Sequence, residues 1–154
     1  MEKGVTGQGS VVATCVSTKK GTRKKPVEVL RLRVGLGIEG DAHAGRWHRQ
    51  VSLLPDEAVD TMRERGLELN AGDFAENILV RGMDLKGLPV GTTLDAGSAR
   101  LVVTQIGKTC HNDCEIRRIT GMCVMPTEGI FCVVVRDGEV RAGDVVRVVP
   151  QQEA

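Results

Sequence analysis

The sequence is poor in aromatic residues, which make up 2% of its 154 residues, and it contains no Tyr. Aromatic side chains are the platforms on which single-stranded nucleic acids stack. An excess of either charge is also missing, because 21 Lys and Arg residues nearly balance 20 Asp and Glu residues. No global field therefore draws the chain toward nucleic acid or anionic lipid. We expect neither nucleic acid nor a membrane as a partner, and any anion site must be local.

Long apolar runs are absent as well. The first residues, MEKGVTGQGS, lack the apolar core of a secretory signal, and no apolar run is long enough to cross a bilayer. The five cysteines are an odd number, and four of them lie in the last third of the chain. In a reducing compartment, this pattern favours free thiols, a metal or catalysis over disulfides. We expect a cytoplasmic protein in which Cys15 and Cys132, both in apolar runs, are inert buried thiols.

Length and composition are those of one globular domain, expected to span residues 1–154 with a core of about 10–150. Nineteen glycines separate short runs rich in Val, Leu, Ile and Thr, the pattern of strands bounded by turns. The number of runs suits a mainly β protein with a closed or nearly closed barrel. The predicted strands are Ser10 to Thr18, Val27 to Val34, Gln50 to Leu54, Asn77 to Val80, Thr92 to Ala96, Arg100 to Ile106, Ile130 to Val135 and Val145 to Val149.

Three segments depart from the strand pattern. After Pro55, the stretch DEAVDTMRERG has apolar residues at helical spacing and stops at Gly66, so we predict a helix there. A second short helical turn is expected after Asn112. The segment KKGTRKK at 19–25 is predicted to be a solvated hairpin loop, with an anion or partner contact as the alternative.

The first candidate site is the segment 37–54, GIEGDAHAGRWHRQVSLL. Gly40 and Gly45 bracket Asp41 and His43, and Arg49 precedes a predicted strand. Glycines let backbone N–H groups approach an anion closely, and Arg donates two parallel hydrogen bonds to phosphate or carboxylate. The segment therefore predicts a phosphate loop, although the Asp and His also suit a metal pair or a structural turn. Trp47 is interpreted as a packing anchor.

The second candidate segment is NAGDFAENILVRG, at 70–82. Phe74 is expected to fill the core, while Glu76 and Asn77 place an acid and an amide at the start of a strand. Such polar groups either orient a ligand or hold a loop together. On the residues alone, holding the loop is the favoured role.

The third segment, TQIGKTCHNDCEI at 104–116, leads from a strand to Lys108, Thr109 and Cys110. A thiol beside Lys and His is typical of nucleophilic, persulfide-carrying or metal-binding cysteines, so Cys110 is the best candidate for chemistry. Zinc is an alternative, with ligands among Cys110, His111, Cys114 and Cys123, but the spacing lacks the usual pair of C-x2-C motifs. Glu128, in the turn before the last hairpin, is a further residue expected to face the site.

Taken in order, these segments resemble the MOSC domain, the C-terminal domain of eukaryotic molybdenum cofactor sulfurases, which also occurs alone in bacteria. The matching pieces span about Val11 to Val149 and are the G-D-x-H-x-G loop, Arg49-Gln50 before VSLL, Gly72-Asp73-Phe74, Glu76-Asn77, Val90-Gly91-Thr92, the stretch ending at Cys110, and EVRAGD. The resemblance implies a β-barrel like that of the pyruvate kinase barrel domain, with one or two short helices. It also implies a site for the molybdenum cofactor (molybdopterin).

The resemblance further implies which residues form that site. The expected cofactor-binding residues are Gly40, Asp41, His43, Gly45, Arg49, Glu76, Asn77, Lys108 and Thr109. Cys110 is the expected catalytic residue, carrying sulfur as a persulfide or binding molybdenum. The chain departs from many relatives at Ala75, Thr93, Gly107 and Thr109, where Gly, Arg, Arg and Pro are common. Lys108 and Arg49 are the candidates to compensate for the missing arginines.

Two function classes follow from the resemblance. The first is a binding or carrier protein that holds the cofactor or transfers sulfur for molybdoenzyme maturation. The second is a molybdenum-dependent reductase of N-hydroxylated compounds. Expected partners are molybdoenzymes or cofactor biosynthesis proteins, with a sulfur-donor desulfurase or an electron-donor protein. No pyridoxal phosphate lysine or desulfurase domain is seen in the sequence. A zinc- or thiol-based regulatory protein is the third alternative.

Overall fold

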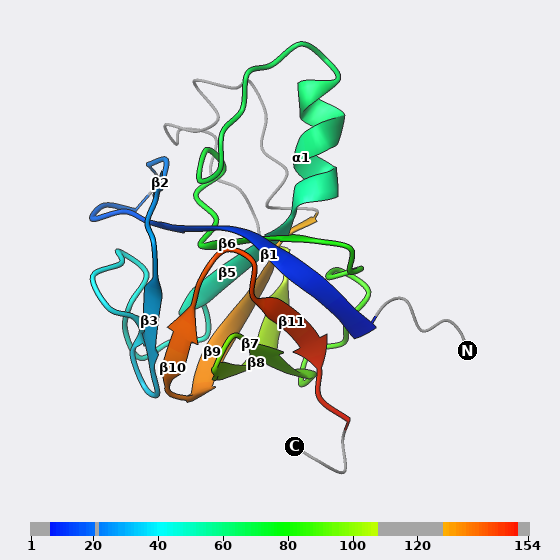
Figure 1. Ribbon diagram of the computed structural model, residues 1–154. Coiled ribbons are helices and arrows are strands. Elements are labelled where there is room, and N and C mark those ends of the chain that lie inside the picture. Colours follow the sequence, from blue (N-terminus) through cyan, green and yellow to red (C-terminus); the bar gives the residue numbers. More distant parts are fainter. Residues whose placement is uncertain (1–6, 21, 108–127, 151–154) are drawn as a thin grey trace.

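The computed structural model describes residues 7–20, 22–107 and 128–150, and its centre is a closed β-barrel (Figure 1). Seven strands follow one another around it in the order β11-β7-β8-β9-β5-β6-β1, and pairing of β1 with β11 closes the ring. Closure leaves the barrel without an exposed sheet edge. The strands are β1 (Gln8–Val16), β5 (Val51–Pro55), β6 (Ile78–Arg81), β7 (Thr93–Ala96), β8 (Ala99–Ile106), β9 (Ile130–Arg136) and β11 (Val145–Val148).

Four shorter strands complete the sheets. β2 (Lys25–Pro26) pairs with the end of β1, and β10 (Gly138–Val140), β3 (Leu30–Arg33) and β4 (Gly37–Ile38) form a separate sheet in that order. Every predicted run contains a strand, and the predicted mainly β barrel is confirmed. The sequence missed β2, β4 and β10, because strands of two or three residues are too short to show an alternating pattern.

The barrel interior is filled by alternate side chains from each strand. In β8, for example, Ala99, Leu101 and Val103 are buried while the residues between them are half-buried. Alternation arises because successive side chains of a strand point to opposite faces. Complete burial of a Leu or Val side chain contributes about 1.5–3 kcal/mol, so this interior is the main source of stability.

One end of the barrel carries a second, smaller core under the helix α1 (Asp56–Arg63) (Figure 1). β5 and β6 are parallel, and α1 lies in the connection between them, as a parallel pair requires. The helix buries Val59 and Met62 against Phe74 and apolar side chains of the strands, so β5 and β6 are covered on both faces.

The helix predicted after Pro55 is confirmed, and so is Phe74 as a core residue. The second predicted helical turn, after Asn112, lies outside the described residues. Within the part of the chain that the structure describes, no helix is long and apolar enough to cross a membrane.

Candidate functional site

The glycine-rich segment connects β4 to β5 and is fixed to the end of β1. The N–H of Ala42 donates to the carbonyl oxygen of Ser17 at 2.7 Å, and the Ser17 N–H donates to Oδ1 of Asp41 at 3.1 Å. The Asp41 N–H bonds to the carbonyl of Ile38 at 3.2 Å, closing a turn whose third residue, Gly40, has a φ of +80°. Glycine adopts this conformation without steric cost. Gly40 therefore permits the turn that places Asp41 beside Ser17, the residue that follows β1.

The second half of the loop is fixed to the barrel by Gln50. Its Nε2 donates to the carbonyl of Gly45 at 2.9 Å, and its Oε1 accepts the N–H of Val134 in β9 at 3.0 Å. Gln50 is 4% exposed, so these bonds satisfy a polar group that burial would otherwise penalise. The loop between Gly40 and Gly45 is thus held at both ends.

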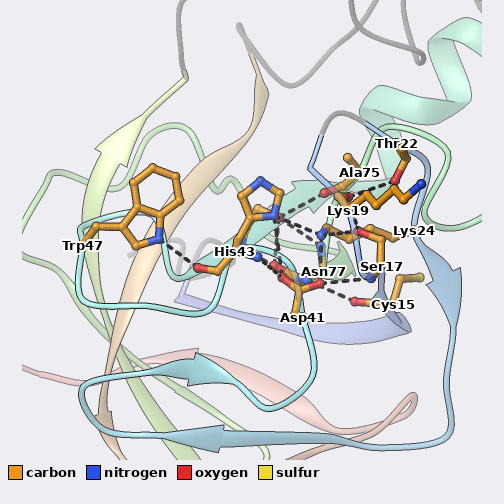
Figure 2. Close-up of polar contacts among 11 residues, drawn as sticks. Cys15, Ser17, Lys19, Thr22, Lys24, Asp41, His43, Trp47, Ala75 and Asn77 are labelled. Carbon is orange, nitrogen blue, oxygen red and sulfur yellow. Dashed lines mark hydrogen bonds and ion pairs between the residues drawn. The ribbon is translucent and has the colours of Figure 1, made fainter.

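A buried polar cluster lies between the loop and the end of β1 (Figure 2). The Lys24 ammonium donates to Oδ1 of Asp41 at 2.8 Å, and neither side chain is exposed to solvent. Burial would raise the pKa of the Asp41 carboxyl, but the neighbouring His43 ring, 3.6 Å away, the Lys24 ammonium and the His43 backbone N–H outweigh it and hold that pKa well below its usual range. Burial lowers the pKa of Lys24, and Asp41 opposes that change. The cluster is a desolvated ion pair, which is stable only while both partners are present.

The prediction of a solvated loop at 19–25 is wrong for Lys24. Its neighbour Lys25 is exposed as expected, whereas Lys24 is 2% exposed and its N–H bonds to the carbonyl of Gly72 at 2.8 Å. In a run of five basic residues, nothing in the sequence marks one side chain as buried. Only its pairing with Asp41, 17 residues later, decides the matter.

His43 and Trp47 extend the cluster toward solvent (Figure 2). Nδ1 of His43 lies 3.0 Å from the Lys24 ammonium, and the His43 side chain is 19% exposed. The indole N–H of Trp47 donates to the carbonyl of His43 at 2.8 Å, and the two rings are parallel, with centroids 6.2 Å apart. The ammonium of Lys20 lies 4.5 Å from the centre of the Trp47 ring. Trp47 was predicted to be a packing anchor, but it is half-buried and belongs to neither apolar core; its described contacts are the hydrogen bond to His43 and the neighbouring rings and cations.

Arg49 and His48 tie the loop to the end of β8 through Gln105. Oε1 of Gln105 accepts Nε–H of Arg49 at 3.0 Å and lies 2.7 Å from Nε2 of His48. Nε2 of Gln105 donates to the carbonyl of Gly107 at 2.7 Å. The pairing of β8 with β9 shifts register between Val103 and Gln105, a bulge of the kind that redirects side chains near sites. Sequence reasoning missed Gln105, because a single Gln in a strand carries no distinguishing pattern.

Glu76 and Asn77 form hydrogen bonds with the segment 72–74 and with residues of β1 and β5. Glu76 accepts the N–H groups of Gly72 and Phe74 at 2.7 and 3.2 Å. Asn77 accepts the Ser52 N–H at 3.0 Å and donates to the carbonyl of Cys15 at 3.1 Å. Both are buried, and burial raises the pKa of Glu76 to about 7. They hold the segment 70–77 together, which is the role favoured from the residues alone.

Two residues of the segment 70–77, Gly72 and Ala75, have a positive φ. A Cβ at Gly72 would lie 2.1 Å from the carbonyl oxygen of Lys24, so only glycine allows the buried lysine segment to pack there. Ala75 has a φ of +64°, a left-handed conformation that costs a residue with a Cβ about 1–2 kcal/mol. Glycine, which the resemblance leads us to expect at this position, would adopt the conformation without that cost.

The described thiols are unreactive, as predicted for both. Cys15 and Cys132 are free and completely buried. Burial raises the pKa of Cys15 to about 12 and raises that of Cys132 as well. Neither therefore supplies a thiolate at neutral pH.

The segment predicted to carry the chemistry lies outside the described residues. This applies to Lys108, Thr109 and Cys110, and to the zinc candidates His111, Cys114 and Cys123. Among residues 7–20, 22–107 and 128–150, no group of three or more His, Cys, Asp or Glu side chains could hold a metal ion. Glu128 is described, and its carboxylate pairs with the ammonium of Lys86 at 3.1 Å.

A pocket of about 1020 Å³ adjoins the buried cluster on the side of β2. Its walls come from the ends of β1 and β2 and from the segment 70–73. Ser17 and Lys24 belong both to its wall and to the cluster, and Lys19, Arg23 and Lys25 add positive charge. The pocket is of a size that holds a small ligand.

These observations define the class of protein. It is a small closed barrel whose glycine-containing loop is held by a buried ion pair. The loop places basic side chains beside the end of β8. The family model of the MOSC domain matches residues 40–147, which include this loop and most of the barrel. The chain belongs to the MOSC domain family. This family is associated with molybdenum cofactor binding and sulfur transfer.

Solved structures confirm the fold. YuaD from Bacillus subtilis superposes with a TM-score of 0.74 at 21% identity, covering 92% of this chain and 95% of that chain. YiiM from Geobacillus stearothermophilus gives 0.73 at 21% identity, covering 93% and 76%. YiiM from Escherichia coli gives 0.66 at 20% identity, covering 94% and 70%. A search of curated proteins gave no match.

Proposed function

We propose that this protein binds the molybdenum cofactor at the glycine-containing loop and carries sulfur as a persulfide on Cys110 for molybdoenzyme maturation. The observation that carries the proposal is the convergence of the loop and the end of β8 on Gln105. Arg49 and His48 reach Gln105 from the loop, and Gln105 in turn bonds to Gly107. Cys110 follows Gly107 by three residues in the sequence.

The residues near that point fit an anionic ligand. The Arg49 guanidinium lies 5.9 Å from the Trp47 ring centre and 5.4 Å from that of Phe131. Its Nε–H donates to Gln105, and the contacts among the described residues leave the two remaining nitrogens of the fork for a phosphate. Lys20 and His48 add further donors beside Trp47. When bound, the cofactor would supply a thiophilic metal for which a thiol is a suitable ligand.

The sulfur step proposed for Cys110 is an ordinary exchange. The Cys110 thiolate attacks the outer sulfur of a donor persulfide, a new S–S bond forms, and the donor leaves as its thiolate. The electrons balance without an added oxidant or reductant. The donor is a cysteine desulfurase carrying a persulfide, and the acceptor is a molybdoenzyme or a cofactor biosynthesis protein.

The test separates binding from sulfur transfer. Arg49→Ala is expected to weaken binding of isolated molybdenum cofactor about 10- to 100-fold, because a charged hydrogen bond is worth about 1.5–3 kcal/mol. Its persulfide loading should be unchanged. Cys110→Ser should lose persulfide loading, measured by mass spectrometry, while its unfolding midpoint stays near that of the wild type. Arg141→Ala is the matched control, since Arg141 lies between β10 and β11 and pairs with Glu139. Full sulfur transfer by Cys110→Ser would contradict the carrier role.

A further inference from the structure

Lys24 is the most unusual described residue of the site, because lysines are almost never fully buried. Its side chain has 0% exposure. The ammonium group lies 2.8 Å from Oδ1 of Asp41, 3.0 Å from Oγ of Ser17 and 3.0 Å from Nδ1 of His43. An ammonium has three hydrogens, and each of them has one partner here. Replacing Lys24 alone would leave the Asp41 carboxylate buried without a counter-charge, but replacing the whole pair by apolar residues is often neutral or stabilising. Stability alone therefore does not explain why the pair is present.

The contact with His43 fixes the position of the imidazole proton. A lysine ammonium donates hydrogen bonds and accepts none, so Nδ1 of His43 must be the acceptor at 3.0 Å. Oδ2 of Asp41 lies 3.6 Å from the same nitrogen, beyond hydrogen-bond distance, and accepts the backbone N–H of His43 instead. Neutral His43 therefore carries its proton on Nε2.

The orientation of the ring is fixed as well. Trp47 lies parallel to it and donates its indole N–H to the His43 carbonyl. Figure 2 shows one ring nitrogen turned toward Lys24 and Asp41 and the other turned away from them. The His43 side chain is 19% exposed, and its Nε2 lies on the side of the ring away from Lys24 (Figure 2).

We propose that Lys24 is a positioning residue that holds His43 in the Nε2–H tautomer, so that the imidazole donates a hydrogen bond to an anionic oxygen of the bound ligand. The ligand part of this inference rests on the proposed function, whereas the tautomer part does not. Lys20 and Arg49 lie over the Trp47 ring, and their charge favours an anionic oxygen over a neutral one.

The tautomer can be measured directly by long-range ¹H–¹⁵N correlation on histidine-labelled protein, with His43 assigned by its loss in His43→Gln. The wild type is expected to have a protonated Nε2. In Lys24→Met, Nδ1 loses its donor and is expected to take the proton and donate it to Asp41. Lys25→Met, a change of the exposed neighbour, should leave the wild-type pattern. A wild-type His43 protonated at Nδ1 would overturn the proposal, even if Lys24→Met does not fold.

The donor role has a separate readout in the affinity for isolated molybdenum cofactor. Gln places an N–H close to the position of Nε2, so His43→Gln should bind within about threefold of the wild type. His43→Leu keeps the bulk and removes the donor, and should bind at least about tenfold more weakly, equivalent to about 1.4 kcal/mol. Equal binding by all three proteins would overturn the donor role. Absence of binding by the wild type would overturn the proposed function and the donor role with it, while the measured tautomer would still decide the role of Lys24.

Discussion

Asp41 and Asp95 are two carboxylates of the same chain with opposite surroundings. Asp95 lies at the surface of the barrel, 15% exposed, and pairs with Arg100, Arg136 and Arg147 at 2.8, 3.3 and 3.4 Å. Among the described residues, Asp41 pairs with the ammonium of Lys24 at 2.8 Å, and neither side chain of that pair is exposed. Both carboxyl groups have a lowered pKa, that of Asp95 chiefly through its hydrogen bond from Arg100.

The difference shows that the number of ion pairs around a carboxylate does not measure their contribution to the free energy of unfolding. Water and salt screen charges at the surface, and an exposed pair is worth about 0–1 kcal/mol. A buried charge that loses its partner has no water to replace it, and the loss is about 3–5 kcal/mol. Loss of a charge in the loop around Asp41 should therefore destabilise the protein more than loss of a charge in the arginine cluster around Asp95.

The largest expected effect comes from replacing each carboxylate by its amide. Asp41→Asn leaves the Lys24 ammonium buried without a counter-charge and should lower the free energy of unfolding by about 3–5 kcal/mol. Asp95→Asn should lower it by about 1 kcal/mol, and by less in 0.5 M NaCl, because salt screens Arg136 and Arg147, the more exposed of its three partners. Urea titrations of both variants, with and without salt, measure these values. Equal losses from the two substitutions would contradict the comparison.

A second expected effect is a pH dependence that opposes that of Asp41. The folded-state pKa of Glu76 is raised from 4.5 to about 7, so the folded protein retains a proton that the unfolded chain has lost. Stability should fall as pH rises from about 4.5 to 7, by about 3 kcal/mol in total. Asp41, whose pKa is lowered, stabilises above its unfolded value of 3.8 and loses that contribution as pH falls.

Glu76→Gln isolates the first of these contributions. In this variant, the decline in unfolding free energy between pH 4.5 and 7 should disappear, while the loss at lower pH remains. Glu28→Gln changes an exposed carboxyl and serves as the control. An unchanged pH profile in Glu76→Gln would show that its carboxyl is ionised in the folded protein throughout this range.

The smallest expected effect is a gain in stability at Ala75. Ala75→Gly removes the cost of a Cβ at a φ of +64°, and that gain exceeds the added entropy of the unfolded chain. We expect an increase of about 0.5–1 kcal/mol in the free energy of unfolding. The same change at Ala58, inside α1, should decrease it by about 1 kcal/mol. Thermal melts of the two variants should therefore shift in opposite directions.

Most of the fold was readable from local patterns. Alternation in β8 and the 3.6-residue period of α1 each reflect which side chains face a core, and both are properties of consecutive residues. The glycine-containing loop was also recognisable, because Gly40 and Gly45 surround the polar residues they position. Gln105 and Lys24 were not, since their partners lie 56 and 17 residues away.

The sequence by itself determined a barrel of short strands, one helix, and the loop that carries Asp41 and His43, because each depends on interactions between near neighbours. Only the tertiary structure decided that Lys24 is buried while Lys25 is exposed, and that Asn77 bonds to Ser52 in β5 and to Cys15 in β1. The physical reason is that burial of a charge depends on whether a partner arrives from a distant part of the chain. The packing of β1, β2 and the loop brings Lys24 and Asp41 together, and no local sequence pattern predicts this contact.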